Sequence, residues 1–210
     1  MSNTFSSENF TRIVNHLAQK DPELGLIIRK HSYPPMWTRP NTFATLIHII
    51  LEQQVSLASA KAALLKLKKY IGAITPQKLL LLSDVELRSC YFSRQKTIYA
   101  RELATSIVEK KLQLKKMALL KDEEIRDELK KIKGIGDWTV DIYLLFVLKR
   151  SDVFPTGDLA MINALKHLKK LPKQTTQEEI IKLAESWRPY RSVAAYLLWH
   201  YYIQSGGIRV

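Results

Sequence analysis

LKKIKGIGDWTVDIYLLFVLKRSDVFPTGD, residues 129–158, is the stretch of sequence that decides the fold. Gly134 and Gly136 interrupt a helical pattern, because glycine takes the positive φ angles that other residues resist. A second helix is predicted to begin near Asp137 and to run apolar through Val147. A glycine turn that leads into a helix offers free backbone N–H groups, which suit a phosphate. Three lysines add positive charge around this turn: Lys130, Lys131 and Lys133.

The same stretch ends on a carboxylate. The segment VFPTGD contains a proline and a glycine, so it is predicted to be a loop that delivers Asp158 to the start of another helix, 159–171. An aspartate at a helix start is most often a cap for backbone N–H groups. Taken alone, the position of Asp158 therefore favours a structural role.

Composition narrows the class of protein. The chain has 210 residues, a formal net charge of +13 and an isoelectric point near 9.7, which favour a polyanionic partner. That partner could be nucleic acid or an anionic membrane surface, and an ordinary basic protein is the simpler alternative. Glycine and proline are few, with 7 and 8 residues, so a mostly helical chain is expected.

The sequence also indicates the compartment. The first ten residues, MSNTFSSENF, lack the charge and apolar core of a signal peptide, and no run of 18 apolar residues could span a membrane. The single cysteine, Cys90, indicates a reducing compartment and excludes an internal disulfide or a four-cysteine iron–sulfur cluster. We expect an intracellular protein that is not secreted, in the bacterial cytoplasm or the eukaryotic nucleus.

Three further blocks stand out along the chain. An apolar helix that Asn41 can cap is predicted to run through Gln54. It ends in the segment ILEQQVS, with Ser56 as the cap of a helix over 57–71. YFSRQK places Ser93 at the start of another basic helix. Near the C-terminus, WRPYRSVAAYLLW precedes and forms the last apolar helix. By themselves, Gln53 and Gln54 look like solvent-facing polar residues, and Trp199 looks like part of the core.

Together, the hairpin LKKIKGIGDWT, its following acid and the three blocks resemble the helix-hairpin-helix (HhH-GPD) DNA glycosylase superfamily. The resemblance covers roughly residues 40–205 and is strongest to the alkylation-repair branch, of the 3-methyladenine DNA glycosylase II type, in a short form without an amino-terminal β domain. It implies one all-α glycosylase domain, 1–210, made of two helical subdomains. Residues 41–150, ending with the hairpin 129–139 and its second helix, would form one subdomain. Residues 1–40 and 151–210 would form the other, with the active site in the cleft between them.

The resemblance also assigns roles to individual residues. It makes Asp158 the catalytic carboxylate, and Gln54 with its neighbour Gln53 the wedge that fills the space left by a flipped base. Electron-rich aromatic rings would form the base pocket: Trp138, Tyr190 and Trp37. The DNA backbone would be bound by Lys131, Lys133, Gly134, Ile135, Gly136 and Arg191. Two departures from the family pattern affect the turn and the pocket: Tyr91 replaces a common glycine, and Ile142 a pocket aromatic.

These roles predict a monofunctional enzyme. Trp138 stands where relatives with lyase activity carry a nucleophilic lysine, so no Schiff base is expected. Asp137 and Asp141 are interpreted as structural. The expected partner of a monomeric chain is double-stranded DNA with alkylated purines of the 3-methyladenine or 7-methylguanine type, and not a membrane. A glycosylase for deaminated or oxidised bases, or a DNA-binding module without catalysis, would also fit.

No organic cofactor, metal centre or iron–sulfur cluster is expected. The five histidines, which show no ligand spacing, are His16, His31, His48, His167 and His200. By resemblance, the hairpin could hold a structural Na⁺ or K⁺ through three backbone carbonyls, those of Lys130, Ile132 and Ile135.

Overall fold

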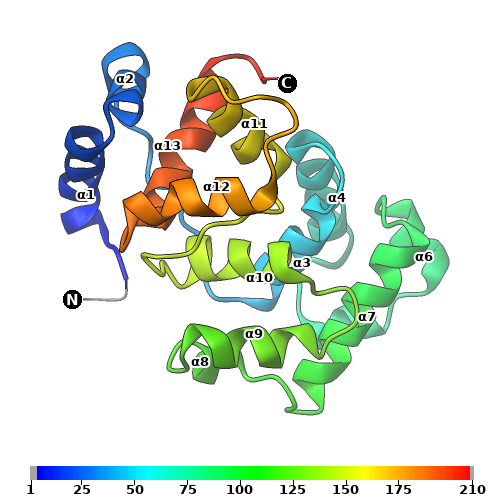
Figure 1. The fold of residues 1–210 in the computed structure, drawn as a ribbon. Helices are drawn as coiled ribbons and strands as arrows, with labels where there is room; N and C mark the ends of the chain where they lie inside the picture. The colour runs from blue at the N-terminus through cyan, green and yellow to red at the C-terminus, as the bar shows by residue number, and fades with distance from the viewer. Residues whose placement is uncertain (1–3, 209–210) are drawn as a thin grey trace. The chain divides into compact units, whose positions relative to one another are not determined.

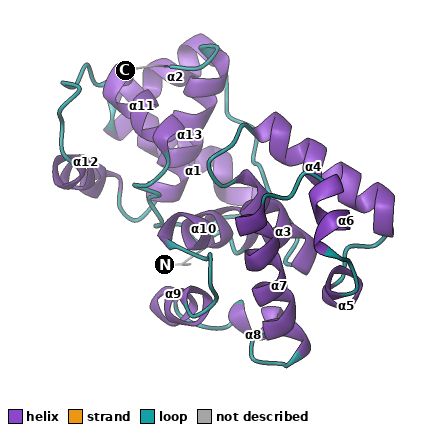
Figure 2. Cartoon of the chain, turned by 90° about the vertical axis from the view of Figure 1, so that its right-hand side faces the viewer, coloured by secondary structure: helices purple, strands orange, loops and turns teal. Residues whose placement is uncertain are grey.

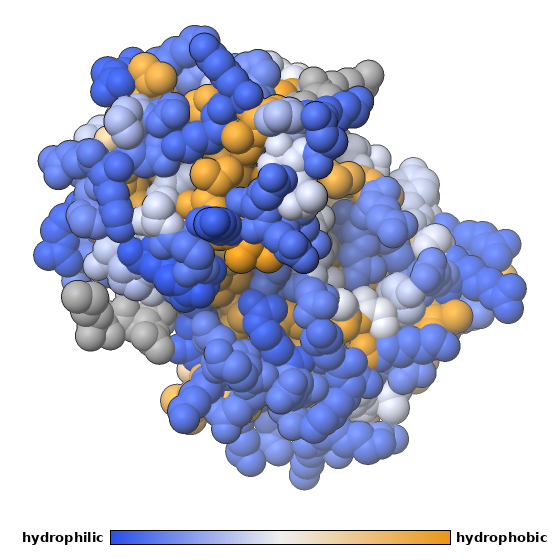
Figure 3. Space-filling model, in the orientation of Figure 1, coloured by the Kyte–Doolittle hydropathy of each residue, from blue (hydrophilic) through white to orange (hydrophobic). Residues whose placement is uncertain are grey.

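The computed structural model describes residues 4–208, and every regular element in that range is a helix (Figures 1 and 2). Thirteen α-helices, one π-helical turn and one 3-10 turn follow each other, and a single isolated β-bridge joins Thr4 to Arg150. The predicted all-α class is therefore confirmed. In the same range, no helix is both long and apolar enough to cross a membrane. The face drawn in Figure 3 is largely hydrophilic, with smaller groups of hydrophobic side chains.

The chain divides into two compact units. The middle unit is the continuous segment Arg39–Tyr143, and the terminal unit combines Met1–Thr38 with Leu144–Val210. The chain passes from the middle unit back to the terminal unit inside a π-helical turn, η1 (Tyr143–Val147). The sequence predicts one regular helix here, and the structure instead ends the α-helix at Ile142.

Eight helices build the middle unit: α3 (Phe43–Glu52), α4 (Leu57–Ile71), α5 (Pro76–Leu80), α6 (Asp84–Ser89), α7 (Arg94–Val108), α8 (Leu114–Met117), α9 (Asp122–Lys130) and α10 (Asp137–Ile142). Helix α3 is apolar on nearly all sides and buries most of its length against α4, α7 and α10. It starts at Phe43 because the hydroxyl of Thr42 accepts the N–H of Thr45 at 3.2 Å. The sequence places the cap one residue early, at Asn41, and the end of the helix two residues late, at Gln54.

Helix α4 has the bounds that the sequence predicts. The Ser56 hydroxyl accepts the N–H of Ser59 at 3.2 Å, and Gly72 ends the helix at a φ of 72°. Ser93 likewise caps α7, where its hydroxyl accepts the N–H of Lys96 at 3.2 Å. Local cap signals in the sequence therefore place both helices correctly.

The turn between α6 and α7 keeps a glycine-like conformation without glycine. Tyr91 has a φ of 67°, in the left-handed region. Its N–H donates to Arg88 at 2.9 Å, and the N–H of Phe92 donates to Leu87 at 3.1 Å. These two bonds form a Schellman motif, and the side chains of Phe92 and Leu87, the residues joined by the longer bond, are both buried. The backbone of this turn thus matches one that glycine would adopt, although the family's usual glycine is absent.

Because of this backbone strain, we expect glycine at position 91 to give a more stable protein than alanine. A left-handed φ costs a residue with a Cβ about 1–2 kcal/mol, whereas glycine adopts it freely. We expect Tyr91→Gly to exceed Tyr91→Ala in free energy of unfolding by about 1 kcal/mol. Both variants lose the contact between the Tyr91 ring and the Lys66 ammonium, which is 4.0 Å from the ring centroid. Urea denaturation of the pair measures the difference, and a more stable alanine variant would contradict the assignment of strain.

Five α-helices and a 3-10 turn build the terminal unit: α1 (Ser7–Lys20), α2 (Pro22–His31), α11 (Leu159–Leu168), α12 (Gln177–Ala184), η2 (Glu185–Trp187) and α13 (Arg191–Gln204). Helix α13 is central and packs on α1, α2 and α11, with nine consecutive buried residues from Ser192 to His200. Asp21 caps α2 and also accepts bonds from Lys169 and from the buried Trp187. This ion pair and indole bond join α2 to the segments that follow α11 and α12.

Helix α11 ends at Leu168, so its predicted end at Leu171 is wrong. Lys170 takes a φ of 51°, and the N–H of Leu171 turns back to the carbonyl of Lys166 at 2.8 Å. Lysine is an uncommon residue for this conformation, which explains why the sequence pattern pointed to Pro172 as the stop.

Candidate functional site

The glycine hairpin joins α9 to α10 in the middle unit. The N–H of Ile135 donates to the carbonyl of Ile132 at 3.0 Å and closes the turn, while Gly134 takes a φ of 91°. Ile132 and Ile135 are buried, at 7% and 4% exposure, and anchor the turn to the unit. Gly136 is exposed and caps α10. The hairpin is therefore fixed by its isoleucines and leaves the backbone at Gly136 exposed.

The two glycines of the hairpin differ in how much space surrounds them. A Cβ built on Gly134 would lie 2.0 Å from Cγ of Tyr99, a distance that atoms do not reach without displacement. Tyr99 belongs to α7, and its hydroxyl accepts a hydrogen bond from Gln95. A Cβ on Gly136 would meet no heavy atom within 4 Å, and its φ of −102° suits any residue. The fold therefore requires glycine at position 134 but not at position 136.

Tyr99 is a residue of this site that the sequence analysis missed. Its ring lies directly under Gly134, and it follows Lys96 on the same helix. The only signal in the sequence was its place in the helix that begins with YFSRQK, and nothing local pairs it with the hairpin.

The hairpin lysines are mostly exposed. Lys130 pairs with Asp137 at 2.7 Å, Lys131 pairs with Glu128 at 2.6 Å, and Lys133 is exposed at the tip. Solvated pairs of this kind stabilise a fold by less than about 1 kcal/mol and exchange readily for another anion. Lys131 and Lys133 are therefore accessible, as phosphate binding would require.

Helix α10 carries Trp138, which is partly exposed, and Asp141, which is buried. Burial raises the pKa of the Asp141 carboxyl from 3.8 to about 6, although the adjacent Arg126 guanidinium opposes that rise. Arg126 donates a hydrogen bond to Asp141 and ties α9 to α10. This contact supports the structural interpretation of Asp141, and the pair of Asp137 with Lys130 does the same for Asp137.

The Asp141 pKa predicts a pH-dependent stability. Between about pH 4 and pH 6 the folded chain holds a proton on Asp141 that the unfolded chain releases. The contribution of this group to the free energy of unfolding should therefore fall as the pH rises through that window, by up to about 3 kcal/mol. Thermal unfolding of wild type and Asp141→Asn at each pH measures it, with the exposed Asp127→Asn as control. If the free energy of unfolding of wild type, relative to Asp141→Asn, instead rises with pH, the pKa of Asp141 is not raised.

The turn between α3 and α4 carries the two glutamines. Gln54 is exposed, with a φ of 57°. Gln53 points the other way: its Nε2 donates to the carbonyl of Gly134 and to Oγ1 of Thr139, each at 2.9 Å. The structure thus separates the two candidates, with Gln54 at the surface and Gln53 bound to the hairpin.

In the terminal unit, Asp158 caps α11. Its Oδ1 accepts the N–H of Met161 at 2.9 Å and the indole N–H of Trp199 at 3.0 Å. The carboxylate is partly exposed, so two donors hold it in a fixed orientation without enclosing it. Capping and a chemical role are compatible in this geometry, because both N–H groups bind the same oxygen, Oδ1, and the side chain stays partly exposed.

Trp199 was interpreted as core, and that interpretation is incomplete. The side chain is buried, at 9% exposure, but its indole nitrogen holds Asp158. Its ring stacks on Phe146, with centroids 5.1 Å apart and planes 26° from parallel. The available signal was its fixed place at the end of the WRPYRSVAAYLLW block.

Two of the predicted pocket aromatics lie in the terminal unit. Trp37 is partly exposed and stacks on Tyr196 at 5.4 Å and 28°, and the Tyr196 hydroxyl donates to the carbonyl of Trp37. Tyr196 also contacts Trp199 edge-on at 6.3 Å, so rings continue from Trp37 to the residue that holds Asp158. Tyr190 instead contacts His16 edge-on at 5.8 Å. The third candidate, Trp138, belongs to the middle unit.

Arg191 braces a loop. Its guanidinium, with only 14% of the side chain exposed, donates to Asp152 at 2.8 Å and to Glu185 at 3.1 Å. The next residue, Ser192, is fully buried and binds both Arg150 and Val153 through its hydroxyl. These bonds fix the loop that leads to Asp158, and they favour a bracing role for Arg191 over the predicted contact with DNA.

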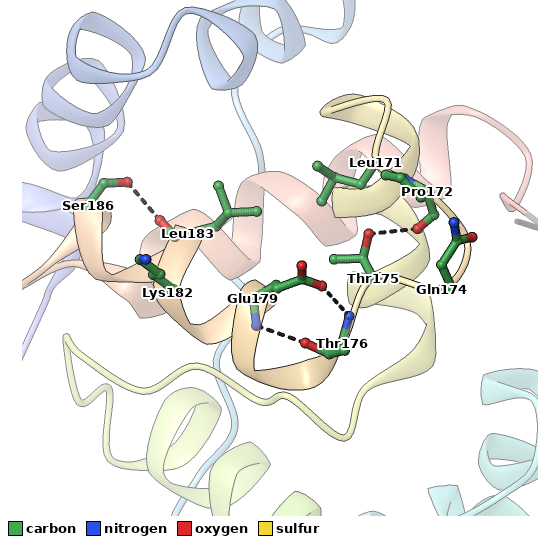
Figure 4. Close-up of a pocket in the computed structure, with 9 residues that line it drawn as sticks. All are labelled: Leu171, Pro172, Gln174, Thr175, Thr176, Glu179, Lys182, Leu183 and Ser186. Atoms are coloured by element: carbon green, nitrogen blue, oxygen red, sulfur yellow. Dashed lines mark hydrogen bonds between the residues drawn. The ribbon is translucent and has the colours of Figure 1, made fainter.

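A groove of about 800 Å³ lies elsewhere in the terminal unit, beside α12 and the loop that precedes it (Figure 4). Three of its polar side chains form local hydrogen bonds: Glu179 with Thr176 in a capping box, and Thr175 with the carbonyl of Pro172. None of the predicted site residues lines it. In residues 4–208, no cluster of three or more histidine, cysteine or acidic side chains is arranged to hold a metal.

Comparison with known proteins identifies the family. Residues 47–189 match the model of the HhH-GPD superfamily base excision DNA repair protein, and the chain belongs to this superfamily. It is 32% identical over 161 residues to DNA-3-methyladenine glycosylase 1 of Schizosaccharomyces pombe, an alignment that covers 75% of this chain and 71% of the relative. It is 28% identical to DNA-3-methyladenine glycosylase of Saccharomyces cerevisiae, over 91% of this chain and 79% of the relative.

A solved structure has the same fold. The Schizosaccharomyces pombe 3-methyladenine DNA glycosylase in complex with abasic DNA superposes with a TM-score of 0.82 at 28% identity. The alignment covers 90% of this chain and 95% of that one. The predicted superfamily is thereby confirmed.

Proposed function

We propose that the chain is a monofunctional DNA glycosylase that hydrolyses the N-glycosidic bond of alkylated purines, of the 3-methyladenine or 7-methylguanine type. The single observation that carries this proposal is the seating of Asp158. It is a partly exposed carboxylate, held by a backbone N–H and an indole N–H, in a chain of the glycosylase superfamily. The names of the relatives support the alkylated substrate.

The chemistry requires little more than this carboxylate. Breaking the bond between base and sugar develops positive charge on the sugar, and a fixed carboxylate stabilises that charge and orients the attacking water. A purine alkylated at N3 or N7 is already cationic and leaves without prior protonation. Electron-rich aromatic faces attract such a cation, which is the role we assign to Trp37, Trp138 and Tyr190.

The glycine hairpin and the α3–α4 turn supply the grip on DNA. The exposed backbone at Gly136, with Lys131 and Lys133, would bind phosphates, and Gln54 would enter the stack where the base has left. A structural Na⁺ or K⁺ at the carbonyls of the hairpin is compatible with their chemistry, because hard cations prefer oxygen ligands. The carbonyl of Ile132 already accepts one N–H, so a cation would use its second lone pair.

Lyase chemistry is not part of the proposal. It requires an uncharged amine beside the sugar, and Trp138 stands where lyase relatives carry lysine. Burial lowers the pKa of one lysine ammonium, that of Lys96. Its Nζ donates to the carbonyl of Leu51 at 2.6 Å, so this amine is held against the backbone at the end of α3.

Base release from defined lesions tests the proposal. We expect the wild-type protein to release 3-methyladenine or 7-methylguanine from duplex DNA, to leave the abasic strand intact, and to form no covalent adduct when borohydride is added. Strand cleavage without alkali, or a borohydride-trapped adduct, would assign lyase activity instead. Release of uracil, hypoxanthine or 8-oxoguanine alone would assign another specificity, and binding without any release would leave a DNA-binding module.

A further inference from the structure

The turn between α3 and α4 is strained and exposed. Gln54 holds a φ of 57°, and its neighbours Val55 and Leu57 are 44% and 65% exposed. A non-glycine residue keeps such a φ only where the surrounding structure imposes it. The contacts that impose it therefore determine where the tip of this turn can be.

Two charged contacts fix the end of α3 before the turn. Lys96 of α7 donates its ammonium to the carbonyl of Leu51 at 2.6 Å and satisfies a terminal carbonyl of the helix. Glu52, buried to 7% exposure, receives both arms of the Arg39 guanidinium, at 2.7 and 2.8 Å. Charge-assisted and bidentate bonds of this kind hold geometry better than single neutral bonds.

The third contact joins this turn to the glycine hairpin. The Nε2 of Gln53 donates to the carbonyl of Gly134 and to Oγ1 of Thr139, across 81 and 86 residues of sequence. A glutamine amide has two N–H donors, and these two acceptors use both of them. The nitrogen of Gln53 therefore has no proton left for DNA.

We propose that Gln53 is a positioning residue that sets the spacing between the wedge and the phosphate-binding hairpin. The inference rests on the proposed function, and it gives Gln53 a role different from that of Gln54. Gly134 lies in the hairpin turn and Thr139 on the first turn of α10, so one amide spans the turn and the helix after it. The hairpin and the wedge then meet the DNA as a single rigid surface, all within the middle unit.

This coupling matters for base flipping more than for binding. A hairpin that grips phosphates does so wherever the α3–α4 turn is placed. Insertion of Gln54 succeeds only when the turn reaches the correct base step, and a misplacement of about 1 Å can reduce an enzymatic rate by about 100-fold. Loss of the Gln53 contacts should therefore reduce excision and recognition of an abasic site, and leave binding to undamaged DNA unchanged.

Gln53→Met removes both N–H donors but keeps a side chain of similar size and the same charge. We expect single-turnover excision at saturating protein to fall about 10- to 100-fold. The preference for a duplex with a tetrahydrofuran abasic analogue over undamaged duplex should fall by a similar factor, while affinity for undamaged duplex stays within about two-fold. Gln77→Met, at an exposed glutamine of α5, is the matched control and should leave every quantity unchanged. Thr139→Val removes one acceptor and should give a smaller loss in the same direction.

A second test is whether low pH restores the excision rate of a Gln53→Glu variant. Gln53→Glu replaces the donors by a carboxylate that faces the Gly134 carbonyl, and protonation of that carboxyl restores one donor. The excision rate of this variant relative to wild type should recover several-fold between pH 8 and pH 5.5. The corresponding ratio for Gln53→Met should not change with pH.

Two outcomes would overturn the inference. If folded Gln53→Met excises within two-fold of wild type, Gln53 does not position the wedge. If it loses affinity for undamaged duplex as strongly as it loses excision, the contact only maintains the hairpin. A wild-type protein that releases no base from alkylated DNA would reject the proposed function itself, which is a different result from either of these.

Discussion

Asp158→Asn is expected to reduce base release by on the order of 10³-fold or more, with little change in affinity for duplex DNA. The charge of the carboxylate matters when the sugar becomes cationic and matters little before that. Asparagine keeps an oxygen that can accept the N–H groups of Met161 and Trp199, and it caps helices as well as aspartate does. The variant should therefore fold normally, and single-turnover assays with an alkylated duplex would isolate the chemical step.

Two companion variants sharpen this test. Asp127→Asn removes a charge at an exposed position of α9 and should excise at the wild-type rate. Trp199→Phe keeps a ring against Phe146 but removes one donor to Asp158, so we expect an intermediate loss of about 10- to 100-fold. If Asp158→Asn excises near the wild-type rate, Asp158 is only a helix cap and the proposed chemistry is wrong.

Gly134→Ala should have the largest effect on stability. The added Cβ would overlap the ring of Tyr99, and the φ of 91° is unfavourable for alanine. The steric and conformational costs together predict a loss of roughly 2–5 kcal/mol in free energy of unfolding. Chemical denaturation measures this loss. A loss under 1 kcal/mol would mean that the hairpin shifts away from Tyr99 at little cost.

The same position allows a rescue and a control. Tyr99→Ala removes the obstructing ring, so adding Gly134→Ala in that background should cost only the backbone strain, about 1–2 kcal/mol. Gly136→Ala should leave stability within about 0.5 kcal/mol, because its Cβ points into open space. It should nevertheless weaken duplex binding and flatten the log–log salt slope from the wild-type value of about −4 to −5 expected for four to six phosphate contacts. Unchanged binding would remove Gly136 from the DNA-contacting surface.

Local signals in the sequence predicted much of the fold. Hydroxyl caps at Ser56, Ser93 and Thr176 act within four residues of chain, so the pattern of residues alone locates the helix starts. Helix ends were harder. Tyr91 and Lys170 adopt left-handed angles without being glycine, and backbone hydrogen bonds across each turn accompany these angles. The π-helical turn at Tyr143–Val147 also leaves no mark in the apolar pattern.

The residues of the candidate site also differ in how far the sequence alone predicts them. Spacing and family context predict Asp158 and the hairpin glycines as candidate site residues. The partners of these residues could not be predicted, because each comes from a distant part of the chain. Three such contacts are visible only in the folded structure. The Tyr99 ring lies against Gly134, the Trp199 indole binds Asp158, and the Gln53 amide binds the hairpin. Arg191 illustrates the opposite case, since a basic residue in a family block turns out to brace a loop through Asp152 and Glu185.

The order of the two units along the chain also determines when each unit can fold during synthesis. All helices of the middle unit have been made once Tyr143 is added, whereas the terminal unit lacks its central helix until Gln204 is added. At about 5–20 residues per second, the roughly 60 intervening residues take about 3–12 s, and domains fold as units during translation. The nascent chain therefore completes its glycine hairpin several seconds before Trp199, made 41 residues after Asp158, arrives to hold the carboxylate.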